Sequence, residues 1–66
     1  MDGTFVSKVA ILKEQQWRAD DGTLMDGATL AMRMQRFGVI TSPDALLDAP
    51  IGFCLKTGVS AWERIK

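Results

Sequence analysis

The sequence predicts a small single domain of mixed α+β class over residues 1–66, with an N-terminal strand or hairpin, a central helix and a short helical C-terminal third. Three observations predict this class. The N-terminal segment is rich in β-branched and aromatic residues, the middle carries one clear amphipathic period, and the last third restarts after helix-capping residues. A chain of 66 residues is at most one domain.

The N-terminal element lies in "TFVSKVAILKEQQW". Imperfect alternation of apolar and polar residues and the β-branched content favour a strand over residues 4–13. A short helix is the alternative, because Phe5, Val9 and Leu12 also recur at the helical spacing. We favour the strand.

Turn residues separate this element from the middle of the chain. Asp21-Gly22 is a hairpin signal, and the chain can return through residues 23–25. A second Asp-Gly pair follows at Asp26-Gly27. The first pair therefore predicts a hairpin before the central helix.

The central helix is predicted over residues 27–37. Asp26 can cap its start, and Gly38 stands where a left-handed residue ends a helix. One apolar face is formed at helical spacing by Leu30, Met34 and Phe37. Arg33 and Arg36 point elsewhere and suit the negative end of the helix dipole.

The chain restarts at "TSPDALLDAPIG". Ser42 is a good N-cap and Pro43 fits a first helical position, which predicts a short helix over residues 43–49. Pro50 ends this helix or starts another, since the residue before a proline avoids the helical region. Residues 51–56 are either a second short helix or a strand.

Two interpretations fit the tail, "LKTGVSAWERIK". In the helical one, Gly58 ends a helix, and Ser60 and Glu63 have the spacing of a capping box at the start of the next. In the other, apolar residues alternate over 51–55, the chain turns at 56–58, and a strand that includes Trp62 returns. We favour the helix.

The stretch "TGVSAWERIK" is similar to the corresponding stretch of small helix-turn-helix regulators of the excisionase and phage kind, over residues 51–66. Val59 fits an apolar position of that motif, while Arg64 stands where the family has a second apolar residue. The resemblance implies a DNA-binding transcriptional or recombination regulator whose tail faces duplex DNA, with further basic residues on phosphates. The expected DNA-binding residues are Arg33, Arg36, Lys56, Ser60, Trp62, Arg64 and Lys66.

Net charge supports a second function class. Eight basic and eight acidic residues give a net charge of zero, whereas non-specific affinity for nucleic acid comes from neutralising phosphates. The alternative is a non-enzymatic protein-interaction module or inhibitor that uses exposed apolar anchors. Its expected interface residues are Trp17, Met32, Phe37 and Trp62.

Catalysis, metals and cofactors are not expected. The chain has no histidine and a single cysteine, Cys54, so it offers no zinc ligand set, no intramolecular disulfide and no cysteine–histidine pair. In "GFCLK", Cys54 is expected to be a small buried hydrophobe. Asp20 and Asp21 are adjacent and indicate a solvated turn.

Chain length and hydropathy indicate the oligomeric state and the cellular compartment to expect. A folded chain this short buries only about 60% of its unfolded surface, so a homodimer is expected. The apolar fraction of 47% predicts a folded domain. No segment approaches the roughly 20 apolar residues that span a bilayer, and no signal peptide is visible. The expected compartment is the cytoplasm.

Overall fold

Two helices, a 3-10 turn and four strands follow one another along residues 3–66. The computed structural model describes residues 3–66, and their side chains from residue 7 onward. Met1 and Asp2, which open the segment searched for a signal peptide, lie outside the described residues. In chain order the elements are α1 (Gly3–Glu14), β1 (Gln16–Ala19), β2 (Leu24–Asp26), α2 (Gly27–Arg36), η1 (Pro43–Leu46), β3 (Cys54–Lys56) and β4 (Ala61–Arg64). The predicted α+β class is confirmed.

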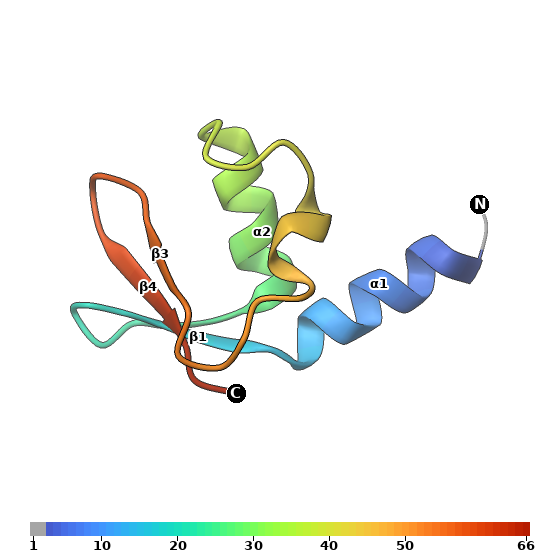
Figure 1. The fold of residues 1–66 in the computed structure, drawn as a ribbon, viewed down its shortest axis with the longest axis horizontal. Coiled ribbons are helices and arrows are strands. Elements are labelled where there is room, and N and C mark those ends of the chain that lie inside the picture. The colour runs from blue at the N-terminus through green and yellow to red at the C-terminus, as the bar shows by residue number, and fades with distance from the viewer. Residues whose placement is uncertain (1–2) are drawn as a thin grey trace.

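The strands form one antiparallel sheet in the order β2-β1-β4-β3. One face carries Trp17, Ala19 and Trp62, all buried, and α2 packs against it (Figure 1). The opposite face is open and carries alternating polar residues such as Arg18 and Glu63. The sheet is therefore packed on one side only, as is common for antiparallel sheets.

The predicted N-terminal strand over residues 4–13 is wrong, because this segment forms α1. Among the described side chains, Leu12 is buried and Val9 is half-buried, at the helical spacing, while Ile11 between them is exposed. The helical period that the sequence offered as an alternative therefore decides the structure. Contact with α2 fixes the C-terminal half of α1, and the helix extends outward from there (Figure 1).

The predicted C-terminal helix is also wrong, because β3 and β4 form a hairpin. The residues "TGVS" still make a turn: the Thr57 hydroxyl accepts hydrogen bonds from the amides of Val59 and Ser60, and Gly58 has a φ of +88°. Ser60 and Glu63 form no capping box, since both lie in or beside an extended strand. Pairing of β4 with β1 places Trp62 opposite Ala19 in the core.

The predicted central helix is confirmed as α2, with its caps. The carboxylate of Asp26 accepts hydrogen bonds from the amide and the hydroxyl of Thr29, at 3.1 and 2.7 Å. At the other end, Gly38 has a φ of +77°, and the Val39 amide donates a hydrogen bond back to the Met34 carbonyl. This is the left-handed ending that the glycine predicted.

The segment between α2 and β3 is less helical than expected. Only Pro43–Leu46 of the predicted 43–49 helix forms a 3-10 turn, and the Ser42 side chain makes no capping bond. Residues 54–56 form strand β3, one of the two alternatives predicted for residues 51–56. The predicted hairpin at Asp21-Gly22 is confirmed, and it joins β1 to β2.

The side chain of Gln15 joins three parts of the fold. It is buried, its amide nitrogen donates to the carbonyls of Leu46 and Leu47 at 3.0 Å each, and its oxygen accepts from the Trp17 indole at 3.2 Å. Its backbone carbonyl accepts from the Gly27 amide. Glycine is required there, since a Cβ would lie 2.5 Å from the Leu12 carbonyl oxygen.

Replacing this side chain tests its role. Gln15→Leu keeps the volume but leaves the buried indole N–H of Trp17 without a partner, which costs about 1–3 kcal/mol. It also removes one hydrogen bond from each of the carbonyls of Leu46 and Leu47. We expect the free energy of unfolding to fall by at least about 2 kcal/mol in urea denaturation. The matched control, Gln16→Leu at the exposed neighbouring position, should change it by less than about 0.5 kcal/mol. Equal losses in the two variants would contradict the role.

The Asp26 cap predicts an acid-dependent stability. Hydrogen bonding from Thr29 lowers the pKa of Asp26 below its ordinary value of 3.8, against a smaller opposing effect of burial. Folding thus favours the carboxylate. Its contribution is complete above pH 3.8 and is lost as the pH falls through the lower folded-state pKa.

Asp26→Ala should therefore lower the free energy of unfolding by about 1 kcal/mol at neutral pH. The difference from the unsubstituted protein should shrink as the pH falls below 3.8, measured by urea unfolding across the acid range. Asp48→Ala, at an exposed carboxylate outside any described capping bond, is the control. A difference that is independent of pH would refute the assignment of the cap to the charged form.

Candidate interaction surface

The C-terminal end of α2 and the β3–β4 hairpin enclose a groove of about 320 Å³. Its floor is formed by Met34 and Trp62, which are 2% and 4% exposed. Its rim carries Phe37 and Val59, which are 67% and 94% exposed. The complete lining is Arg33, Met34, Phe37, Val39, Thr57, Val59, Ser60 and Trp62. We call this hollow the α2–hairpin groove.

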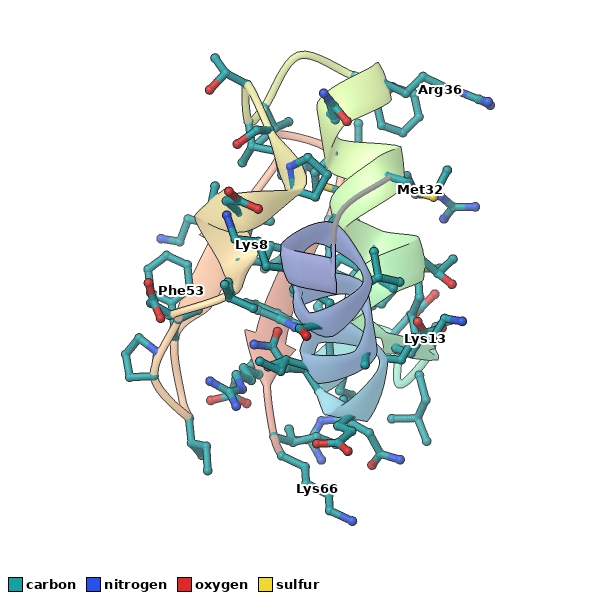
Figure 2. All side chains as sticks on the ribbon, turned by 90° about the vertical axis from the view of Figure 1, so that its right-hand side faces the viewer. Lys8, Lys13, Met32, Arg36, Phe53 and Lys66 are labelled. Carbon is teal, nitrogen blue, oxygen red and sulfur yellow. The ribbon has the colours of Figure 1, made fainter. Side chains whose placement is uncertain are left out.

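A second hollow continues from the groove along the outer side of α2. It is lined by Thr29, Met32, Arg33, Gln35, Arg36 and Phe37. Arg33 and Phe37 belong to both hollows, so the two form one continuous surface. Met32 and Arg36 project from the same side of the helix (Figure 2), and Met32 is 69% exposed.

The helical period explains why these side chains stay outside. Leu30, Ala31 and Met34 form the buried stripe of α2. At 100° per residue, Met32 falls on the opposite side, and Phe37 lies at the edge of the stripe on the last turn. Gly38 then redirects the chain, so that no later segment covers Phe37.

This surface is basic as well as apolar. Arg33 and Arg36 line it, and neither hollow has an acidic lining residue. The ion pairs found among the described residues are Lys8–Asp44 and Arg18–Glu63, which lie elsewhere. Neither guanidinium group is in an ion pair with a described residue, so both can pair with an external anion.

The expected DNA-binding residues fall into separate places. Arg33, Ser60 and Trp62 share the groove, where Trp62 is buried as floor. Arg64 donates to the carbonyls of Ala49 and Lys66 within the chain. Lys66 lies at the opposite end of the molecule from Arg36 (Figure 2). The remaining residue, Lys56, is exposed on edge strand β3.

The expected protein-interface residues are brought together more closely. Met32 and Phe37 share the outer hollow, and Phe37 and Trp62 share the groove. Trp17 belongs to the core instead: it is 0% exposed, and its ring meets that of Phe53 edge-on at 6.2 Å between centroids. This residue is therefore no surface anchor.

Two further residues differ from expectation. Cys54 was expected to be buried, but it is exposed on β3. Cys54 is two residues from Lys56 on the same strand and opposite Glu63, so its side chain lies on the open face of the sheet. Val59, apolar and buried in the regulator motif, is here the most exposed large hydrophobic residue described. Its position directly after the turn glycine was the one signal in the sequence for a loop tip.

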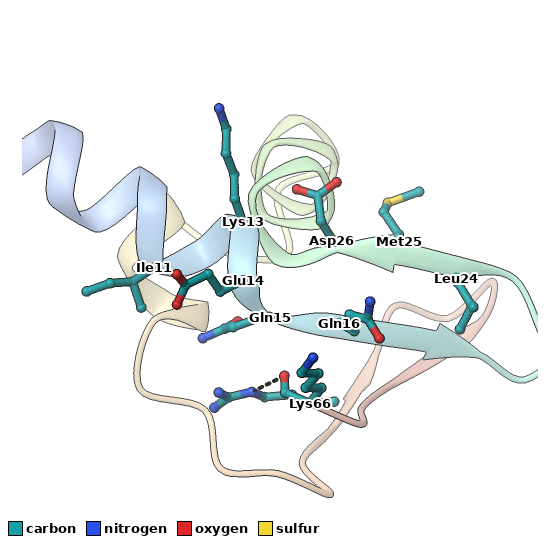
Figure 3. A pocket seen from close by; sticks show the side chains of 10 residues that line it. Ile11, Lys13, Glu14, Gln15, Gln16, Leu24, Met25, Asp26 and Lys66 are labelled. Atoms are coloured by element: carbon teal, nitrogen blue, oxygen red, sulfur yellow. Dashed lines mark hydrogen bonds between the residues drawn. The ribbon is translucent and has the colours of Figure 1, made fainter.

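A third hollow, about 790 Å³, lies where α1 meets β1, β2 and the C-terminal residues (Figure 3). Its lining mixes cations such as Lys13 with the carboxylates of Glu14 and Asp26. The Asp26 carboxylate is engaged by Thr29, and its lowered pKa makes it a weak base. Asp26 is therefore a poor candidate for a general base in this hollow.

Comparisons with known proteins add no family to this description. No protein-family model, no curated protein and no solved structure matches the chain. Across residues 3–66, no helix is long and apolar enough to cross a membrane, and no group of three or more potential ligands among His, Cys, Asp and Glu is placed to hold a metal ion.

Proposed function

We propose that this chain is a non-enzymatic protein-interaction module that binds a partner polypeptide in the α2–hairpin groove. The observation that carries the proposal is the groove itself, with buried Met34 and Trp62 below and exposed Phe37 and Val59 above. Aromatic and methionine side chains around a concave apolar site are typical of the energetic centre of a protein interface.

The rim charges specify the partner. Arg33 and Arg36 flank the apolar centre without a described ion pair, and an acidic residue on the partner would neutralise them. The proposed occupant is therefore a segment with one large apolar side chain between Asp or Glu residues. The apolar side chain fills the groove, and the carboxylates pair with the two guanidinium groups.

Binding of duplex DNA by a regulator is the competing proposal. The proximity of Arg33 and Arg36 favours it, because two adjacent cations can contact phosphates. The groove gives it less support, since the large apolar side chains of Met32, Phe37 and Val59 are exposed around these arginines. We further propose a cytoplasmic setting, given the single free thiol, and a homodimer.

The test compares two peptide pools by NMR on the labelled full chain. One pool places Phe, Leu or Trp between Asp and Glu, and the other places the same residues between Lys and Arg. We expect the acidic pool to shift the amides of residues 33–39 and 57–62. Phe37→Ala should weaken binding at least about tenfold, and Arg33→Glu should do so as well.

Ile51→Ala is the matched control, an exposed apolar residue outside both hollows. Equal binding of the two pools, or shifts confined to other residues, would contradict the proposal. Random duplex DNA that shifts Arg33 and Arg36 at low salt and releases them at higher salt would instead support the regulator.

A further inference from the structure

Strand β3 leaves one edge of the sheet open. It is the last strand in the order β2-β1-β4-β3, and Cys54 and Lys56 on it are both exposed. The opposite edge differs, because α1 and α2 both lie against β2. Figure 1 shows β4 beside β3, and no other strand of the described residues pairs with β3.

The backbone groups of this edge are available for pairing. Leu55 is opposite Trp62, the Thr57 amide donates to the Ser60 carbonyl, and the Arg64 amide donates to the Phe53 carbonyl. Residues that bond to β4 therefore alternate at 53, 55 and 57. In an antiparallel pair, the amides and carbonyls of the residues between them point the other way. Cys54 and Lys56 thus present two donors and two acceptors outward.

We propose that a second copy of this chain pairs antiparallel with β3, about a two-fold axis at Leu55. In this register Cys54 is opposite Lys56 of the second copy, and Leu55 is opposite its own counterpart. All four outward backbone groups of each strand then find partners. The two sheets join into one, and the half-buried Leu55 side chains meet on the face that carries the core.

Side-chain charge favours this register. An axis at Leu55 keeps the two copies of Lys56 apart. An axis at Lys56 would instead place their like charges directly opposite each other, which is destabilising. On the open face, the cross-strand row runs Leu24, Arg18, Glu63, Cys54. Lys56 of the second copy extends this row beside the small thiol.

The lysine can then reach over Cys54 toward Glu63, whose other side meets Arg18 at 3.4 Å. The pairing thus continues the alternation of charge across the joined sheets. This complementarity is why we assign the edge to a second copy rather than to a strand of another protein. The inference specifies the proposed homodimer, and it does not depend on what occupies the α2–hairpin groove.

The first arm of the test measures mass by sedimentation over a range of concentrations. We expect a monomer–dimer equilibrium for the unsubstituted chain. Lys56→Pro removes an outward N–H without removing a bond to β4, so it should weaken dimerisation at least tenfold. Lys56→Ala, which keeps that N–H, should weaken it less. A monomer at all concentrations, or a dimer unaffected by proline, would overturn the inference.

The second arm tests the register by disulfide trapping and does not depend on the proline variant. Residues of a hydrogen-bonded antiparallel pair have Cα atoms about 5.5 Å apart, within disulfide range. A mixture of the unsubstituted chain with a Cys54→Ser, Lys56→Cys chain should cross-link on mild oxidation. Either chain alone should cross-link much more slowly, because its cysteines are diagonal. Rapid cross-linking of the unsubstituted chain alone would move the axis to Cys54 and refute this register.

Discussion

The carboxamide of Gln15 joins, by hydrogen bonds, segments that lie about 30 residues apart in the chain and share one apolar core. It lies at the junction of α1 and β1, and its hydrogen bonds reach the Trp17 indole and the backbone of η1. The bonds to the Leu46 carbonyl and the Trp17 indole are buried, so each is costly to leave unmade. With these bonds in place, every buried side-chain nitrogen or oxygen of the described residues has a partner. Together with the burial of Leu46 in the core, these bonds fix the position of η1, and so the path of the chain from α2 to β3.

The two surfaces that we assign to binding are the parts of α2 and of the sheet that the core leaves uncovered. The sheet buries one face against α2, which leaves the far side of that helix and the β3 edge without cover. A domain of this size cannot bury all its large apolar side chains, and those left over, such as Phe37 and Val59, collect at the end of α2 and the hairpin. The proposed binding surface is thus formed by the apolar side chains that the small core cannot bury.

Local signals predicted the elements that local interactions determine. The α2 helix followed from its period and from Asp26 and Gly38, and the first hairpin followed from Asp21-Gly22. The tail did not, because "TGVS" forms a turn between strands as readily as between helices, and only pairing with β1 distinguishes them. The α1 segment fits both periods, and its contact with α2 decides. The residues of the candidate surface that the sequence had singled out are Met32, Arg33, Arg36, Phe37, Ser60 and Trp62, while Val59 required knowledge of the hairpin.

The pairing of β1 with β4 has a consequence for how the chain reaches this structure. These are the two central strands, yet Arg18 and Glu63, which face each other across them, are 45 residues apart. Closing a flexible loop of that length costs about 3 kcal/mol of chain entropy before the sheet gains any stability. Folding is therefore expected to be slow for so short a chain, with α2 and the first hairpin forming early. Until β4 pairs with them, β1 and β3 each have an unpaired edge. The incompletely folded chain therefore exposes more strand edge than the native one.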